Sequence, residues 1–166
     1  MLKQLISAVD ECFKAFLALL IATMVLCVCW QIVSRYFFND PSQWTEELAR
    51  FLLVWIGMLG ASYAYHKKMH LGLDLLQQKL SLRQQVWHAR FVHLIVILFS
   101  AVVLVGGGSQ LISMTRELEQ YSAALGVSMH WVYMCLPVSG IMLIGYAILD
   151  WVAGSQLAES EGAQHG

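Results

Sequence analysis

Residues 44–70 read WTEELARFLLVWIGMLGASYAYHKKMH, and this stretch decides the class of fold. Three charged side chains, Glu46, Glu47 and Arg50, lead into a long apolar run, and two lysines and two histidines close it. Small residues are spaced along the run, at Gly57, Gly60, Ala61 and Ala64. Because about 20 apolar helical residues cross the ~30 Å hydrocarbon core of a bilayer, the stretch predicts a membrane-spanning helix with charge at its entrance.

The composition of the whole chain supports a membrane protein. Hydrophobic residues make up 58% of the 166 residues and charged residues 13%, whereas soluble domains carry about 25% charged residues. A chain this apolar has too few polar side chains to cover a water-soluble core. Its net charge of -1 provides no basic surface for nucleic acid, and its length fits one domain.

Four apolar runs are long enough to span a bilayer, at residues 13–33, 48–65, 91–114 and 131–149. The first is predicted to be a retained anchor, because Asp10, Glu11 and Lys14 precede it and no small-residue cleavage pattern follows it. Before it, apolar residues repeat at helical spacing and predict an amphipathic segment that lies on the membrane surface before the chain turns inward. These residues are Leu2, Leu5, Ile6, Val9 and Phe13.

The distribution of lysine and arginine predicts the orientation, because these residues concentrate on the cytoplasmic side. The N-terminal segment and the loop between the second and third spans hold most of them: Lys3, Lys14, Lys67, Lys68, Lys79, Arg83 and Arg90. The other two loops hold Arg35 and Arg116. Both termini are therefore expected in the cytoplasm. Residues 1–154 are predicted to form one four-helix membrane subunit, and residues 155–166 a disordered cytoplasmic tail.

The loop between the second and third spans is predicted to contain an interfacial segment. Ser81 and Gln84 form a capping-box pattern, so the third helix is expected to begin there and continue to about residue 114, longer than the bilayer requires. His70 and Asp74 lie four residues apart and would share a helical face. Two interpretations stand for this pair: solvated interfacial residues, or side chains that attach the segment to a neighbouring helix.

Few residues offer chemistry, and no hydrolase, kinase or nucleotide motif is present. The histidines lie near the ends of the predicted spans, at His66, His70, His88, His93 and His130. They favour interfacial roles, but a haem-binding anchor of a redox complex stays open as an alternative. The cysteines form neither a disulfide framework nor a metal site. Gly106, Gly107 and Gly108 favour close helix packing, with a functional hinge as the alternative. Charges avoid the middle of the spans, which indicates an accessory or scaffolding subunit and not a pump.

Two motifs resemble one family. The run RYFFNDPSQWTEELARFLLVWIGMLGASYAYHKKMHLGLDLL resembles the signature of the small membrane subunit of tripartite ATP-independent periplasmic (TRAP) transporters, the DctQ-like family. A second, weaker match is YSAALGVSMHWVYMCLPVSG. The structural or subunit-interface candidates carried by the first motif are Arg35, Trp44, Glu46, Glu47, Arg50, Gly57, Gly60, Ala61, His70 and Asp74.

The resemblance implies a partner set and a role. TRAP systems pair this subunit with a large membrane subunit that carries the substrate and sodium sites, and with a periplasmic substrate-binding protein. The chain would then be a scaffolding subunit in the bacterial inner membrane, with no catalytic residues, no metal and no cofactor of its own. Uptake of organic acids would be sodium-driven symport. Membrane lipids are the remaining expected partners.

A helical wheel divides residues 44–64 into two sides. One side carries Glu46, Arg50 and the small residues, and the other carries Trp44, Leu48, Phe51, Trp55 and Met58. The charges are explained either as a locally neutralised helix cap or as a network, joined by Arg35, that packs against the subunit's own helices. The second interpretation puts the small side inside the subunit and the bulky side against lipid or the large subunit.

Overall fold

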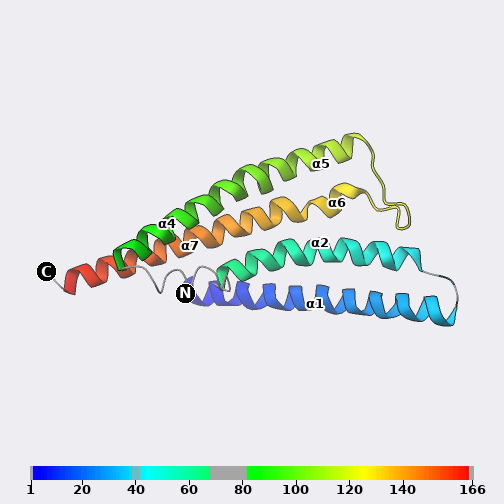
Figure 1. The fold of residues 1–166 in the computed structure, drawn as a ribbon, viewed down its shortest axis with the longest axis horizontal. Coiled ribbons are helices and arrows are strands. Elements are labelled where there is room, and N and C mark those ends of the chain that lie inside the picture. The colour runs from blue at the N-terminus through cyan, green and yellow to red at the C-terminus, as the bar shows by residue number, and fades with distance from the viewer. Residues whose placement is uncertain (1, 39, 41, 68–81, 165–166) are drawn as a thin grey trace. The chain divides into compact units, whose positions relative to one another are not determined.

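The computed structural model describes residues 2–38, 40, 42–67 and 82–164, and these form helices joined by short connections (Figure 1). No β-strand occurs in this part of the chain, although Tyr121 and Ser128 form an isolated antiparallel bridge. The helices are α1 (Leu2–Phe37), α2 (Gln43–His66), α4 (Leu82–Phe99), the π-helix η1 (Ser100–Gly107), α5 (Gly108–Glu117), α6 (Met129–Tyr133) and α7 (Cys135–Gln164).

Among the described residues, four helical segments are long and apolar enough to cross a membrane: Asp10–Phe37, Gln43–His66, Arg90–Glu117 and Met129–Val152. The prediction of an all-α protein with four spans is confirmed. The third segment combines α4, η1 and α5, and its helix begins at Leu82, beside the predicted capping residue. That capping residue, Ser81, and the expected interfacial segment lie outside the described residues, as do His70 and Asp74.

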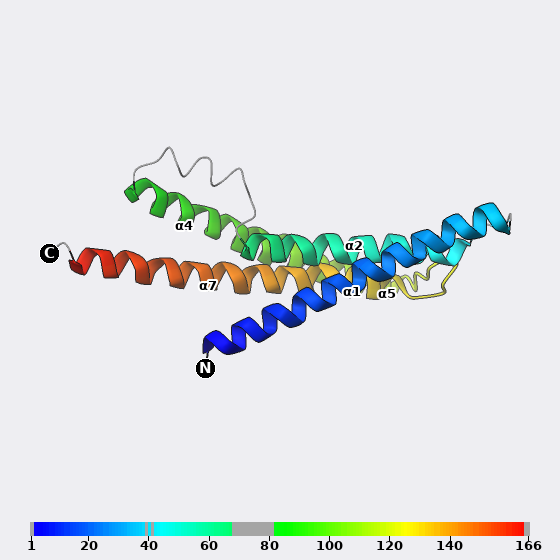
Figure 2. The same cartoon turned by 90° about the horizontal axis from the view of Figure 1, so that it is seen from below.

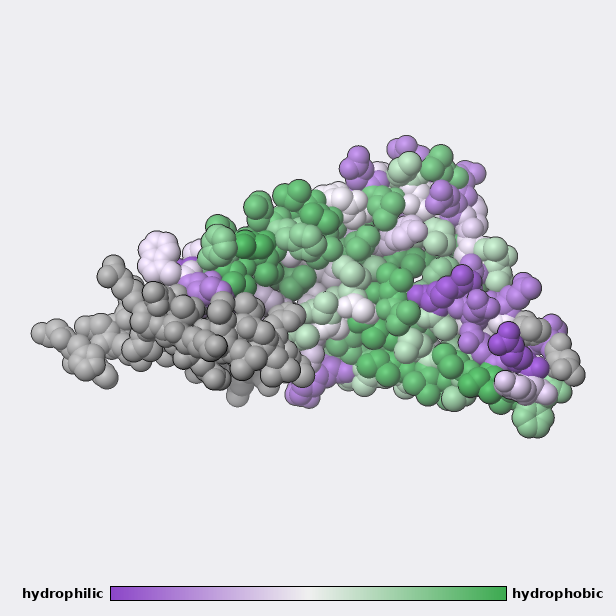
Figure 3. Space-filling view, viewed as in Figure 1, coloured by the Kyte–Doolittle hydropathy of each residue, from purple (hydrophilic) through white to green (hydrophobic). Residues whose placement is uncertain are grey.

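Large apolar side chains point outward from these helices. Only 11% of the apolar window in the first span is buried, and 33% in the fourth. Figure 3 shows hydrophobic residues over the visible helix surfaces and hydrophilic residues gathered near helix ends. Such a surface is unfavourable in water but matches the hydrocarbon of a bilayer.

The chain divides into two compact units, of which the first comprises Met1–Gly60 and Ile112–Cys135. Within it, α1 and the first part of α2 run in opposite directions (Figures 1 and 2). The turn between them is held by the backbone N–H of Ser42, which donates to Oγ of Ser34 at 3.4 Å. Thr45 and Leu59, each 1% exposed, mark the buried face of α2.

The second unit comprises Ala61–Leu111 and Leu136–Gly166. Here α7 approaches η1 and α5 so closely that two glycines have no space for a side chain. A Cβ on Gly140 would lie 2.8 Å from Cβ of Leu104, and one on Gly108 would lie 2.9 Å from Cβ of Leu136. A cluster of Tyr65, Tyr146 and Ala147 is buried in the same unit.

The glycine triplet therefore has two roles. The prediction of close helix packing is confirmed at Gly108, which is buried. It is wrong for Gly106 and Gly107, which are exposed and meet only carbonyl oxygens of their own helix within 4 Å. These two residues lie at the end of the π-helix, where low helix propensity favours a wider turn.

The N-terminal segment differs from its predicted form. Its residues are helical, but α1 runs without interruption from Leu2 to Phe37, so the expected turn into the membrane is absent. At the other end, α7 extends to Gln164, and the alanine, glutamate and glutamine of its last part are good helix formers. The disordered tail expected at residues 155–166 stays a prediction.

Candidate functional site

A turn of the first unit is anchored by the side chain of Glu47. This residue lies in the second turn of α2, whose first residue is Gln43. Its carboxylate accepts backbone N–H bonds from Ala123 at 3.2 Å, Ala124 at 2.8 Å and Leu125 at 3.0 Å. We call residues 121–128 the anchored turn, because one side chain satisfies three consecutive backbone donors of it.

The anchored turn is also closed by its own backbone. The N–H of Ser122 donates to the carbonyl of Val127 at 2.8 Å, and the N–H of Gly126 donates to the carbonyl of Ser122 at 3.1 Å. Gly126 has a φ of 62°, a left-handed conformation that glycine adopts without steric cost. The conformation of the turn is therefore stabilised by Gly126 within it and by Glu47 of α2.

Glu46, the neighbour of Glu47, faces a different environment. It lines a pocket of about 430 Å³ together with Gln31, Ile32, Arg35, Tyr36 and Ser42. We call this the hairpin pocket, because it lies where α1 ends and α2 begins. Arg35 and Glu46 thus lie in one place, but among the described residues no ion pair joins them.

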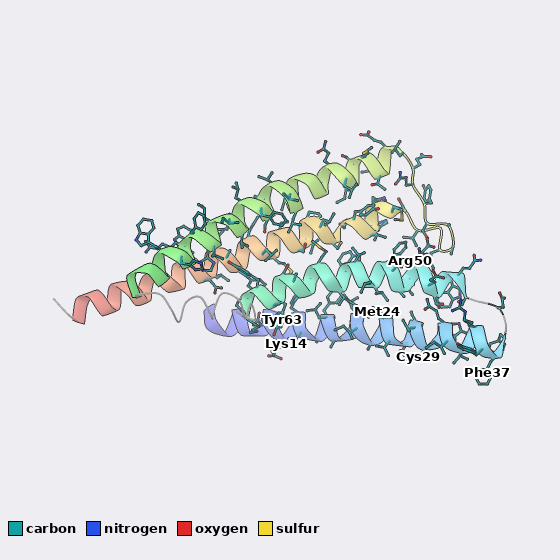
Figure 4. All side chains as sticks on the ribbon, in the orientation of Figure 1. Lys14, Met24, Cys29, Phe37, Arg50 and Tyr63 are labelled. Atoms are coloured by element: carbon teal, nitrogen blue, oxygen red, sulfur yellow. The ribbon has the colours of Figure 1, made fainter. Side chains whose placement is uncertain are left out.

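The charged entrance of α2 fits the helix-cap interpretation. Nη2 of Arg50 lies 3.8 Å from Oε1 of Glu46, and both side chains are about two-thirds exposed, at 67% and 65%. Figure 4 labels Arg50 on α2. An exposed pair of this kind contributes about 0–1 kcal/mol. The predicted packing of this side against the subunit's own helices is met only in part, because Glu46 lines the hairpin pocket beside Arg35 while Glu46 and Arg50 both stay largely exposed.

The same prediction is wrong for the small residues of α2. Gly57 and Ala61 are exposed, and a Cβ added at Gly57 or Gly60 would meet no described atom within 4 Å. Trp55, expected to face outward, is half-buried, whereas Trp44 is 49% exposed as expected.

The true buried face lies along the edge of the bulky side. Thr45, Leu52 and Leu59 recur every seven residues, and Leu48 and Trp55 lie between them. Leu48 and Trp55 belong to the bulky side of the wheel, so the prediction placed the wrong side of α2 inside the subunit.

Hydroxyl and ring contacts hold the second unit. Oγ of the fully buried Ser62 donates to the carbonyl of Ser139 at 3.1 Å. The hydroxyl of Tyr65 lies 2.5 Å from Nδ1 of His93, and the ring of His66 stacks on Tyr146 with centroids 4.2 Å apart. Each of these histidines has a partner on another helix, because His93 of α4 meets Tyr65 of α2 and His66 of α2 meets Tyr146 of α7.

The sequence is similar to one family over most of its length. Residues 24–156 match the family described as tripartite ATP-independent periplasmic transporters, DctQ component. The chain belongs to this family. Both Glu47 and the anchored turn lie within the matched region, so the contact joins the two sequence motifs through which the family resemblance was found.

Three relatives of this DctQ-family chain illustrate its range. The sialic acid TRAP transporter small permease protein SiaQ of Vibrio cholerae is 27% identical over 87% of this chain and 80% of that protein. The sialic acid TRAP transporter permease protein SiaT of Haemophilus influenzae is 32% identical over 69% of this chain, but only 18% of its own length. The isethionate TRAP transporter permease protein DctMQ of Oleidesulfovibrio alaskensis is 28% identical over 79% of this chain and 22% of its own length.

Membership of the DctQ family bears on the redox alternative. The relatives are transporter subunits, and nothing in the comparisons supports a haem-binding anchor. In the described part of the chain, no group of three or more histidine, cysteine, aspartate or glutamate residues could hold a metal. His130 contacts Oγ of Ser128 through Nδ1 at 2.6 Å.

With four apolar spans and TRAP permease relatives, the chain is a multi-pass inner-membrane protein.

Sequence reasoning selected Glu47 but not its role. A glutamate in the second turn of a helix is explained by the helix dipole alone, whereas its partners lie 76–78 residues later. Ser62 and Ser139 were missed because serine in an apolar run carries no distinctive pattern. A serine at the same helical phase as buried leucines is the signal that could have found Ser62.

Proposed function

We propose that this chain is the small scaffolding subunit of a TRAP-type secondary transporter. The observation that carries the proposal is the family match over residues 24–156. The internal bonding fits that role, since polar side chains such as Glu47 and Ser62 fix the chain's own backbone. The subunit supplies no catalytic group, metal or cofactor, and it does not act as an enzyme.

The subunit works with a large permease subunit and a periplasmic binding protein. SiaT and DctMQ support the first partner, because in each of them the match covers about a fifth of a longer permease protein. Sodium binds to the large subunit and drives symport. The cargo is an organic acid, a class to which sialic acid, C4-dicarboxylate and isethionate in the relatives' names all belong.

The large subunit contacts the small residues of α2. Gly57 and Ala61 are exposed, Gly60 is half-buried with no described atom within 4 Å of an added Cβ, and small residues let a second helix approach closely in lipid. Gly57→Leu should therefore reduce co-purification with the large subunit while the isolated chain remains folded. Gly145→Leu, also exposed and without neighbours within 4 Å, is the matched control.

Reconstitution tests the whole proposal. Proteoliposomes with this chain, a large TRAP permease subunit and the binding protein should take up substrate when a sodium gradient is applied. The chain alone should take up none. Transport by the chain alone, or full uptake by the large subunit without it, would contradict a scaffolding role.

Cysteine labelling tests the predicted orientation, with both termini in the cytoplasm. A cysteine introduced at Gln43 or Glu119 should react with a reagent added from the periplasmic side, and one introduced at Lys79 should not.

A further inference from the structure

The hairpin pocket combines opposite charges with polar atoms that lack partners. Nε2 of Gln31 and Oγ of Ser42 are both buried, and neither has a hydrogen-bond partner among the described residues. Both line the pocket, as do Arg35 and Glu46. Buried polar atoms are almost always satisfied, and one left unpaired costs about 1–3 kcal/mol. The pocket therefore has unmet hydrogen-bonding capacity on a wall that also carries charge.

The position of the pocket along the helices selects the class of ligand. Arg35 lies in the last turn of the first span, which ends at Phe37, and Glu46 lies in the first turn of the second span, which begins at Gln43. Figure 4 labels Phe37 at the end of α1. Lipid headgroups occupy this depth of a bilayer. A volume of about 430 Å³ falls in the ~300–1,000 Å³ range of small-molecule sites.

We propose that the hairpin pocket binds the zwitterionic headgroup of a phosphoethanolamine lipid. The guanidinium of Arg35 binds the phosphate, with the amide N–H of Gln31 as a further donor. The carboxylate of Glu46 accepts from the primary ammonium, and the Ser42 hydroxyl bonds to either group. Arginine is suited to phosphate because its planar donors match two oxygens at once. This inference is independent of the transport role, because it concerns the subunit's own anchoring in the membrane.

The charges distinguish this headgroup from those of other phospholipids. Arg35 alone would favour any phosphate-bearing lipid, including phosphatidylglycerol, whose headgroup has no cation. Glu46 is only loosely paired with the exposed Arg50, at 3.8 Å, so its carboxylate would still oppose a purely anionic headgroup and stabilise an ammonium at its side of the pocket. A choline headgroup carries the same charge but has no N–H, so it cannot donate a hydrogen bond to the carboxylate. Only a headgroup with both a phosphate and a donating ammonium uses both residues.

Lipid retention by the full-length chain tests the proposal. The chain is placed in nanodiscs of equimolar phosphatidylethanolamine and phosphatidylglycerol with matched acyl chains, released, and analysed by native mass spectrometry. The unmodified chain should retain phosphatidylethanolamine preferentially. Arg35→Gln should lower retention of both lipids by about tenfold, which corresponds to about 1.4 kcal/mol. Glu46→Gln should remove only the preference, and Arg35→Lys should restore most of the binding.

Arg116 provides the control. It lies in the last turn of α5 and is exposed, but it does not line the pocket. Arg116→Gln should leave retention unchanged. Equal retention by Arg35→Gln and the unmodified chain would overturn the proposal, as would an equal loss in Arg116→Gln.

A second measurement needs no variant, so it holds even if Arg35→Gln fails to fold. Phenylglyoxal modifies arginine, and peptide mass spectrometry compares Arg35 with Arg116 in bilayers with and without phosphatidylethanolamine. Phosphatidylethanolamine should protect Arg35 at least about threefold more than Arg116. Protection of Arg35 by soluble glycerophosphoethanolamine in detergent would show that the headgroup alone suffices, whereas protection by the lipid only would assign the site to a membrane lipid. Equal modification of both arginines in every condition would refute the site.

Discussion

Gly140→Ala should destabilise this subunit although it adds only one methyl group. The new Cβ would lie 2.8 Å from Cβ of Leu104, 3.0 Å from Cγ2 of Val105 and 3.3 Å from the carbonyl oxygen of Ser100. A Cβ cannot rotate away, so the backbone of η1 or α7 must move. Overpacking of this kind costs about 1–3 kcal/mol, and the better helix propensity of alanine returns up to ~1 kcal/mol. The net loss is on the order of 1–2 kcal/mol.

The matched control lies on the same helix. Gly145 is exposed, and a Cβ there would meet no described atom within 4 Å. Gly145→Ala should therefore be neutral or stabilise by up to ~1 kcal/mol. For a chain of this size, each kcal/mol shifts the melting temperature by about 2–4 °C. Thermal melting in detergent, followed by tryptophan fluorescence, should show a fall of about 2–8 °C for Gly140→Ala and no fall for Gly145→Ala.

Second-site changes identify the clash that causes the loss. Val105→Ala removes Cγ2 and should partly rescue Gly140→Ala. Leu104→Ala keeps the Cβ that makes the 2.8 Å contact, so it should give no rescue. These changes are compared as double-mutant cycles, because residues in contact are not additive. The reasoning is refuted if Gly140→Ala and Gly145→Ala shift the melting temperature equally, or if Leu104→Ala rescues as well as Val105→Ala.

Three further predictions concern hydrogen bonds. Glu47→Ala should speed hydrogen exchange at the three turn amides that the carboxylate binds, with Glu47→Gln intermediate and Glu46→Gln unchanged; unaltered exchange in Glu47→Ala would contradict the anchor. Ser62→Ala should lower stability by about 0.5–1.5 kcal/mol in the same melting assay, since the hydroxyl bonds to a carbonyl of α7 inside the membrane; a neutral result would mean that the bond contributes nothing. Tyr65→Phe should lower stability by about 1 kcal/mol through loss of the contact with His93. In a chain that already carries His93→Phe, Tyr65→Phe should have little further effect, and an undiminished loss there would show that the contact is not the cause.

The spans could be predicted from sequence because hydropathy is a local property. Each apolar run became a spanning segment, since a bilayer demands about 20 consecutive apolar helical residues whatever their neighbours are. The buried face of α2 could not be predicted in the same way. A helical wheel divides α2 into two sides, but which side packs inside the subunit depends on which other helix approaches it. Gly57 and Ala61, on the side expected to pack, are exposed. The role of Glu47 likewise depends on a turn far along the chain.

The error on α2 follows from applying the small-residue rule for packing in lipid to glycine and alanine alone. In water, a bulky apolar side would be expected inside, whereas in lipid the hydrocarbon competes equally for those side chains. The small-residue rule was the appropriate correction, but it led to the glycines and overlooked the hydroxyls. In this subunit buried hydroxyls accompany the close contacts: Thr45, Ser62, Ser100 and Ser139 are each 0–1% exposed. A hydroxyl can approach a neighbouring helix closely and also bond to its backbone, as Ser62 does. A glycine offers only the approach. Serine and threonine at heptad spacing are thus a better sequence marker of the internal seam of α2 than its glycines, since Gly57 is exposed.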